Sequence, residues 1–269
     1  MHEFVDETFQ LELTGEKILS IQASLNGFSF SIICPDTKKL LYFRSNSLKI
    51  STENLLSRHF ESWFSEEAVL KNNFKKVVLF YHSENITLVP NHLFHSNSKN
   101  ELPPLLFENN ENSSWINNSI DQIEARLLFT IPEAFRQTII NYFPGVQITH
   151  PLKALIAKND IDGEQKLHLL FDTNHFSVAL TNHNQLQMVN HFMFKHPNDV
   201  VFYLLTILRQ FKLAAKNIIT YYAGDLEGRT ELAELLQKHF PNSTEIQPTI
   251  IPPPFLEKLL ITKNISLFL

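Results

Sequence analysis

The sequence predicts an α/β protein made of two halves that share one order of strands and helices. Two patterns support this fold class: a stretch near the N-terminus matches a later stretch, and strand-like runs alternate with segments of helical spacing. The composition agrees, since 43% of the 269 residues are hydrophobic, 19% are charged, and 23 phenylalanines supply volume for a core. A chain of this length forms one or two domains.

The internal similarity joins residues 19–43 to residues 167–191, which align at one constant offset without a gap. Each segment predicts two strands around a short polar turn, at 24–27 and 172–175, and then a second turn and a third strand. The Asn-Gly pair of the first turn is a strong hairpin signal. Because few aligned positions are identical, two unrelated α/β units of similar rhythm remain the alternative.

Both halves then continue with a helix and a buried strand. The N-cap residue types Ser, Thr, Asn and Asp stand at 51–53 and 196–199, and the apolar positions of the two following helices superimpose at the same offset. Apolar runs at 77–83 and 218–224 are typical of buried parallel strands. A second helix is expected after each run, most clearly at 229–240. Each half is therefore predicted to be β-β-β-α-β-α.

A polar, Asn-rich stretch at residues 96–119 separates these patterns, and we interpret it as a loop or insertion with a short helix or strand at 105–107. The predicted domains are residues 1–150, which include this insertion, and residues 151–269.

The remaining elements are shorter. Residues 120–131 predict one or two strands, 132–143 a helix with Pro132 in its first turn, and 146–149 a short strand. A last helix is expected at 255–260, after three prolines.

Charge and cysteine content narrow the function classes. The net charge of −5 disfavours a nucleic-acid-binding surface, and the single cysteine, Cys34, excludes a disulfide scaffold or a multi-cysteine metal site. The acidic start lacks the features of a secretory signal, and the longest apolar stretch, about 200–208, is shorter than a membrane span. We therefore expect a cytoplasmic protein with no membrane span and no nucleic-acid partner.

Glycine is scarce, with six residues where typical usage is about 7% of the chain. Backbone cradles for phosphate groups rely on glycine, because it permits positive φ angles and close approach of the ligand. The chain therefore has few places to build such a cradle. It also contains no Walker A, G-x-G-x-x-G or G-x-S-x-G motif.

The duplicated plan resembles that of the actin, sugar-kinase and heat-shock-protein ATPase superfamily, in which two ribonuclease-H-like lobes with mixed sheets hold a nucleotide between them. The whole chain resembles a family of uncharacterised Bacteroidetes proteins with an actin-like ATPase fold. The resemblance lies in LSIQASLNGFSFSI, FKKVVLFYHSENITLVPNHLF, HFMFKHPNDVVFYLLTILRQF and IITYYAGDLEGRTELAELL, and it covers most of the chain. Pilus-assembly and type II secretion relatives of this fold act through protein contacts, which is an analogy of fold alone.

The resemblance also implies where a nucleotide would bind. Members that hydrolyse ATP carry Asp-x-Gly in two hairpin turns, and a Gly-Gly pair in a strand-to-helix loop. Here Ser24 stands in place of the first acid, whereas Asp172 keeps the second and His175 replaces a glycine. The candidate nucleotide-binding residues are Ser24, Asn26, Gly27, Asp172, Asn174, Gly224 and Gly228, and no catalytic residue or metal ligand is assigned.

Other side chains near these loops disfavour a phosphate group. The ring of His175 would stand where a phosphate approaches, and Asp225 and Glu227 would face it with like charge. Asp172 itself has two interpretations: it holds a divalent cation through water beside a nucleotide, or it caps its turn as aspartate does in many proteins.

Histidine offers weaker signals. His191 and His196, with His183 nearby, could form a metal group, and so could His92 and His95. Solvated or half-buried histidines explain both sets without a ligand.

The expected function is that of a non-catalytic adaptor or scaffold with a degenerate nucleotide site and a protein partner that the sequence does not identify. The alternative is a nucleotide-binding ATPase or phosphotransferase with unorthodox phosphate loops, for which ATP and magnesium would be the cofactors. A third hypothesis is an oligomer-forming structural protein, and the oligomeric state stays open.

Overall fold

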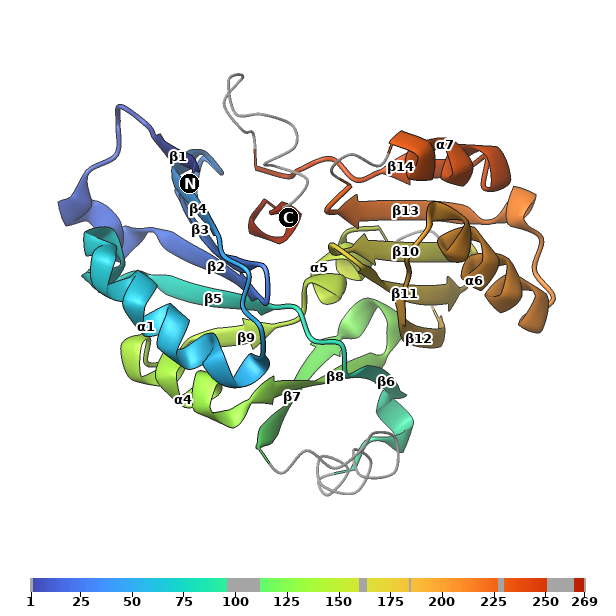
Figure 1. Ribbon diagram of the computed structural model, residues 1–269, viewed down its shortest axis with the longest axis horizontal. Helices are drawn as coiled ribbons and strands as arrows, with labels where there is room; N and C mark the ends of the chain where they lie inside the picture. The colour runs from blue at the N-terminus through green and yellow to red at the C-terminus, as the bar shows by residue number, and fades with distance from the viewer. Residues whose placement is uncertain are drawn as a thin grey trace.

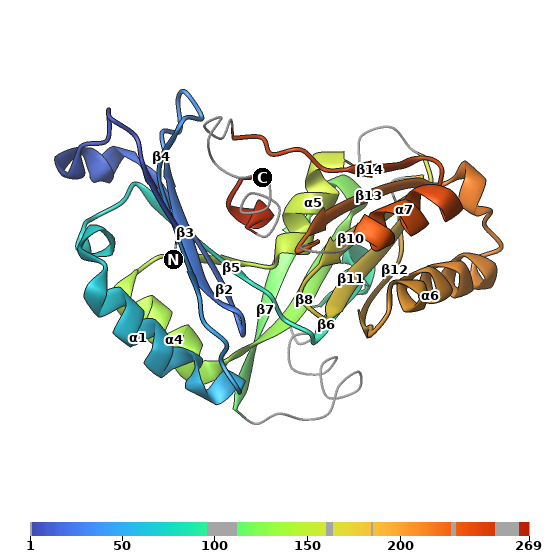
Figure 2. The same ribbon diagram turned by 45° about the horizontal axis from the view of Figure 1, so that its top comes forward.

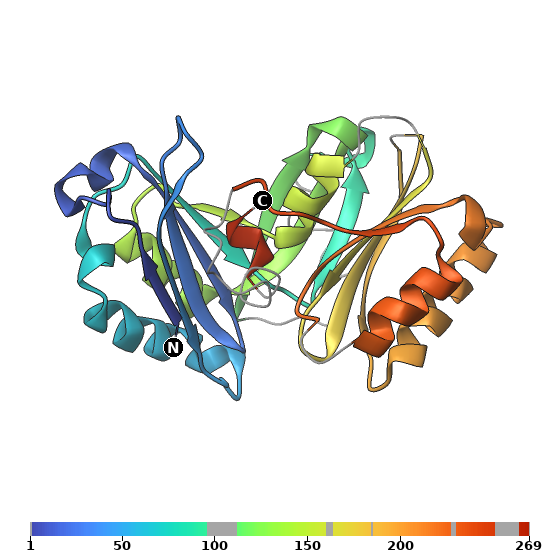
Figure 3. The same ribbon diagram turned by 90° about the horizontal axis from the view of Figure 1, so that it is seen from above.

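The computed structural model describes residues 2–95, 112–159, 164–183, 185–226, 230–250 and 264–268. Two sheets stand side by side, each with helices on its outer face (Figure 1). Seen from above, α5 and the C-terminal turn lie between the two sheets (Figure 3). The protein is thus a mixed α/β structure of two halves, as the sequence predicts.

The first sheet has six strands in the order β1-β4-β3-β2-β5-β9. These are β1 (His2–Val5), β2 (Ile18–Ser24), β3 (Gly27–Ile33), β4 (Leu40–Ser47), β5 (Lys76–Tyr81) and β9 (Gln147–Thr149). β2, β3 and β4 form an antiparallel meander, while β5 runs parallel to both β2 and β9. Strand β1, which extends the sheet at its edge, was not predicted from the sequence.

The second sheet has five strands in the order β12-β11-β10-β13-β14. These are β10 (Lys166–Phe171), β11 (His175–Asn182), β12 (Gln185–Met193), β13 (Ile219–Gly224) and β14 (Ser243–Glu245). Again three strands form an antiparallel meander and two join in parallel. Apart from β1, the strand order and directions repeat those of the first sheet, which confirms the predicted repeat of topology.

The helices cover the sheets. They are α1 (Leu56–Glu66), α4 (Glu133–Tyr142), α5 (Pro151–Asn159), α6 (Pro197–Gln210) and α7 (Thr230–His239). α1 and α4 lie outside the first sheet, and α6 and α7 outside the second (Figure 3). Edge-to-face aromatic contacts join α1 and α4 to the first sheet: the Phe28 ring lies 5.5 Å from that of Phe60, which lies 5.8 Å from that of Phe135.

A third, small sheet corrects the prediction for the middle of the chain. Its order is β6-β8-β7, from β6 (Ile86–Pro90), β7 (Ser113–Ile120) and β8 (Ala125–Pro132). Residues 113–119 are therefore a strand and not part of a loop. No helix directly follows β5, because the chain enters this sheet first and reaches α4 afterwards.

Other expected elements have mixed outcomes. The predicted helices at 132–143 and 229–240 are confirmed as α4 and α7, and the short strand at 146–149 as β9. Helix α5 was not predicted. The expected segments at 105–107 and 255–260 lie outside the described residues, and the domain boundary after residue 150 stays a prediction.

The C-terminal residues 264–268 return to the space between the two sheets (Figure 2). The Ser29 hydroxyl donates to Asn264 Oδ1 at 2.5 Å, and the Ser31 hydroxyl donates to the Leu267 carbonyl at 3.2 Å. The Phe268 ring lies 5.6 Å from that of Phe43 and is buried. This segment therefore packs against the first sheet, although the chain reaches it from the second.

Among the residues that the structure describes, no helix combines the length and the apolar character that crossing a membrane requires.

His168 gives the fold a testable dependence on pH. It is fully buried in β10, and this burial lowers its pKa from 6.5 to about 3. The unfolded chain therefore takes up this proton first as pH falls, so stability is retained above about pH 6.5 and lost towards pH 3. We expect the unfolding free energy of His168→Leu to decrease less steeply than that of the wild type between about pH 6 and 4. The two slopes should differ by at most about 1.4 kcal/mol per pH unit. Urea titrations at several pH values measure this slope, and an unchanged slope contradicts the assignment.

Candidate functional site

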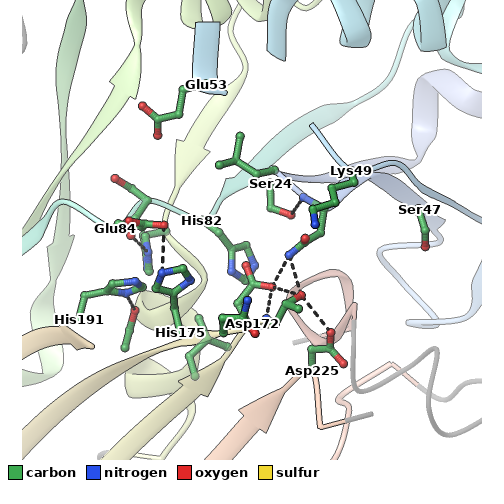
Figure 4. Close-up of a pocket in the computed structure, with 18 of the residues that line it drawn as sticks. Ser24, Ser47, Lys49, Glu53, His82, Glu84, Asp172, His175, His191 and Asp225 are labelled. Carbon is green, nitrogen blue, oxygen red and sulfur yellow. Dashed lines mark hydrogen bonds and ion pairs between the residues drawn. The ribbon is translucent and has the colours of Figure 1, made fainter. Parts of the chain in front are cut away.

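A cavity of about 650 Å³ lies between the two halves, at the ends of their parallel strands. β2, β5, β10 and β13 end at Ser24, Tyr81, Phe171 and Gly224, respectively. Because the carboxyl ends of parallel strands meet at one edge of a sheet, the residues that follow them gather there. The wall includes Ser24, Asn26, Lys49, Glu53, His82, Glu84, Asp172, Asn174, His175, His191 and Asp225 (Figure 4).

The β2–β3 turn is held from both sides. The Ser24 hydroxyl accepts the backbone N–H of Asn26 at 3.1 Å, which caps the turn. Just beyond β4, the backbone N–H groups of Leu48 and Ile50 donate to carbonyls of the turn. These bonds fix the direction in which the Asn26 side chain leaves the turn.

Asn26 reaches across the cavity to the β10–β11 turn. Its Nδ2 donates to Asp172 Oδ1 at 2.7 Å and lies 2.9 Å from Thr173 Oγ1 (Figure 4). Asp172 Oδ1 also accepts the backbone N–H of Thr173 at 2.7 Å. The Asp172 carboxylate therefore stabilises its own turn and joins it to the turn of the other half.

Steric contacts with the backbone, and not a ligand, explain why two of the candidate positions are glycine. Gly27 has φ +119°, and a Cβ there would lie 2.2 Å from the Asn46 carbonyl oxygen. Gly224 has φ +110°, and its Cβ would lie 2.0 Å from the Phe171 carbonyl oxygen. Strand packing thus demands glycine at both positions. A Gly224→Val substitution would consequently disturb β10 and β13, and it could not test nucleotide binding separately from folding.

The structure thus places Ser24, Asn26, Asp172 and Asn174 in one cavity wall, and Gly27 beside a smaller adjoining hollow. Gly224 lies at the end of β13 and is not part of either lining. Gly228 and Glu227 lie outside the described residues. Both His175 and Asp225 line the cavity. That these residues bind a nucleotide stays a prediction.

Acidic side chains dominate the charge of the described cavity wall. Four carboxylates, those of Glu53, Glu84, Asp172 and Asp225, line it together with one lysine, Lys49. An anionic ligand would therefore meet repulsion from most of the charged groups around it.

Three histidines of the cavity wall have lowered pKa values and are therefore mainly uncharged at neutral pH. Burial lowers the pKa of His82, although the negative charge of Asp172 opposes this shift. Burial and the neighbouring His82 hold the pKa of His150 well below its usual value. Burial, with a smaller contribution from His175, lowers the pKa of His191 to about 4.

The sequence predicted only part of a group formed by His175, His191 and Glu84. The His175 and His191 rings stack at 5.2 Å, and His175 Nε2 lies 3.6 Å from Glu84 Oε1. The hairpin register brings the two histidines together, but Glu84 follows β5 and is distant in sequence. His183 lies at the opposite end of β12 from His191, and His196 caps helix α6. The metal group considered for His191 with those two residues is thus not formed.

Comparisons with known proteins agree on the fold. A family model described as "Protein of unknown function (DUF3822)" matches residues 6–243. A Bacteroides thetaiotaomicron protein, described as having an actin-like ATPase fold and unknown function, is 20% identical, with a TM-score of 0.76 over 89% of this chain and 94% of that chain. This match confirms the resemblance and shows that the chain has the actin-like ATPase fold.

More distant structures share the same architecture. A chain of a PilM–PilN type IV pilus biogenesis complex is 11% identical, with a TM-score of 0.58 over 93% of this chain and 96% of that chain. The ethanolamine utilization protein EutJ of Carboxydothermus hydrogenoformans is 7% identical, with a TM-score of 0.50 over 93% of this chain and 89% of that chain. No curated protein sequence matches the chain.

The contact between the two turns is measurable as an energetic coupling. We expect a double-mutant cycle of Asn26→Ala and Asp172→Ala to give a coupling of about 1.5–3 kcal/mol in the free energy of unfolding. Either substitution alone removes the hydrogen bond to the carboxylate, so the double variant does not lose it a second time. Asp6 bonds Lys39 near the sheet edge, so Asn26→Ala with Asp6→Ala should be additive within about 0.5 kcal/mol. Additivity in both pairs would show that the turns do not interact.

Proposed function

The chain belongs to the DUF3822 family of proteins of unknown function, and for this member we propose a non-catalytic role, as an adaptor or scaffold that does not hydrolyse a nucleoside triphosphate. The observation on which this proposal rests is the direct contact between the two hairpin turns through Asn26 and Asp172. In the ATPases that the chain resembles, these two turns hold the phosphates. A triphosphate entering here would first have to break the hydrogen bonds that join them.

The charge of the wall supports the same proposal. Asp172 and Asp225 stand on the two sides of Thr173, whose hydroxyl lies 2.9 Å from Asn26 Nδ2 and 3.5 Å from Asp225 Oδ2. Two carboxylates this close to a phosphate chain repel it by an amount on the order of 1 kcal/mol each near a solvated surface. Lys49 alone offers an ammonium group among the described wall residues.

Helix α6 supports a role in protein contacts. The side chains of Phe202 and Leu205, which are 66% and 40% exposed, lie about one helical turn apart on its surface. Exposed aromatic side chains are enriched at protein interfaces. The PilM–PilN complex is one case in which a chain of this fold is part of a protein complex.

The second candidate function is nucleotide binding with turnover. The cavity volume favours it, since about 650 Å³ falls within the range of small-molecule sites. Asp172 also keeps the acid that the resembled ATPases use, so an ATPase or phosphotransferase with unorthodox loops remains the rival of the adaptor.

ATP with magnesium separates the two candidates. We expect no rise in the melting temperature and no release of phosphate beyond that of Asp172→Ala, because a triphosphate would have to break the hydrogen bonds between the two turns. A ligand at one hundred times its dissociation constant would stabilise the fold by about 2.7 kcal/mol, which a thermal shift detects readily. Saturable stabilisation together with hydrolysis that is lost in Asp172→Ala would overturn the proposal.

The adaptor role has its own test on helix α6. We expect Phe202→Asp to melt like the wild type, within about 0.5 kcal/mol, because the side chain is exposed. The same substitution should remove proteins that co-purify with the wild-type chain from its own cells. Lys238→Gln, on the exposed side of α7, changes the charge by the same single unit and should retain them. Equal recovery with all three chains would exclude this face as the contact.

A further inference from the structure

Strand pairing places two imidazole rings next to one another in the cavity wall. In the register of β11 and β12, Ser177 pairs with His191, and His175 pairs with Met193. Paired residues share a face of a sheet, and so do alternate residues of one strand. His175 and His191 are therefore diagonal neighbours on one face, which explains their stacked rings.

Glu84 completes the group from a different part of the chain. It lies between β5 and β6, and β6 runs close to β12 (Figure 1). Figure 4 shows Glu84, His175 and His191 gathered on one side of the cavity, apart from Asp225. Each of the three side chains offers one ligand atom, and these atoms all lie within 4.8 Å of one another.

The spacing suits a small divalent ion. Zinc binds imidazole nitrogen and carboxylate oxygen at about 2.0–2.2 Å, so ligand atoms around a tetrahedral zinc ion lie about 3.3–3.6 Å apart. The observed ligand atoms, which lie within 4.8 Å of one another, would therefore have to approach by up to about 1.5 Å. The Glu84 carboxylate is already 3.6 Å from His175 Nε2, and its side chain is 58% exposed, so it can supply part of this movement.

One ring nitrogen of His191 has no hydrogen-bond partner in this group. Its Nε2 is buried and has no hydrogen-bond partner within the described structure. Its other nitrogen, Nδ1, lies 3.0 Å from the Ser177 hydroxyl. With the proton on Nδ1 donated to Ser177, the lone pair of Nε2 is left for a ligand, and such second contacts are usual for metal-binding histidines.

We propose that Glu84, His175 and His191 form a binding site for a divalent transition-metal ion of the Zn²⁺ type in the wall of the inter-sheet cavity. Two imidazoles and one carboxylate are a ligand set of borderline metal ions, whereas magnesium prefers oxygen ligands alone. Three protein ligands leave at least one coordination position open, which is the arrangement of sites that bind an exchangeable ligand. Water or an oxygen of a small anionic molecule would occupy that position.

The ion would also change the electrostatics of the wall. Asp172 and Glu84 contribute negative charge here, and a divalent cation would offset it. The site thus goes beyond the proposed adaptor role, and its test contains no nucleotide, so failure of one proposal does not imply failure of the other.

The test is a titration of the metal-free protein with Zn²⁺ in competition with a chromogenic chelator. We expect one equivalent to bind, with Glu84→Gln, His175→Gln and His191→Gln each weakening the affinity by at least about 10-fold. Ser177→Ala should weaken it by about 10-fold through the loss of the contact that orients His191. Co²⁺ absorption bands then report whether nitrogen and oxygen ligands surround the ion.

His183→Asn is the matched control, because it removes an imidazole at the other end of β12 and should leave the affinity unchanged. Thermal unfolding without metal identifies any variant that fails to fold, and the exposed Glu84 keeps the test decisive if a histidine variant unfolds. Zn²⁺ affinity that is equal in the wild type, Glu84→Gln and His175→Gln would overturn the site. So would a wild type that binds no stoichiometric ion.

Discussion

Parallel pairing of β2 with β5 and of β10 with β13 is the constraint from which the site follows. In each sheet it brings two strand ends to one edge, and residues that come directly after the strands at both edges line the same cavity. Both halves obey this rule, and their two first hairpins consequently face one another. The Asn26–Asp172 hydrogen bond is possible only because the topology has already placed the two turns within reach. The chemistry of the cavity is therefore decided by a few residues in the turns and loops together with His175 and His191 of β11 and β12.

Much of this architecture was predictable, because its signals are local. Hairpins, capped helices and apolar strand runs each depend on residues within one short window, and both halves displayed them in the same order. The small sheet was different. Most side chains of β7 are half-buried on both faces of the strand. Its sequence therefore lacks the alternation of apolar and polar residues that would mark it as a strand. Its partner β8 lies beyond a turn, and the sheet is completed by β6, which precedes the polar stretch.

The candidate site divides in the same way. Ser24, Asn26, Asp172 and Asn174 lie in turns that the sequence pattern predicts, and the resemblance to the ATPases marks them as candidates; the structure brings them together in one wall. Glu84 could not be found, because its position depends on where the loop after β5 is carried by the small sheet. Gly224 illustrates a different difficulty: it was expected to bind a nucleotide, whereas the close approach of the β10 backbone already explains why it is glycine. A sequence pattern identifies a special position but does not distinguish a steric reason from a chemical one.

Residues 264–268 affect how far the two halves can move. This short segment contacts β2 on one side and β13 on the other, and its backbone is also bonded to residues 249 and 250. Rotating the halves apart would pull Leu267 and Phe268, both buried, away from the first sheet and expose them to water. The C-terminal segment therefore opposes a hinge motion that would separate the two halves. Small molecules should enter and leave the cavity while the two halves keep their relative orientation.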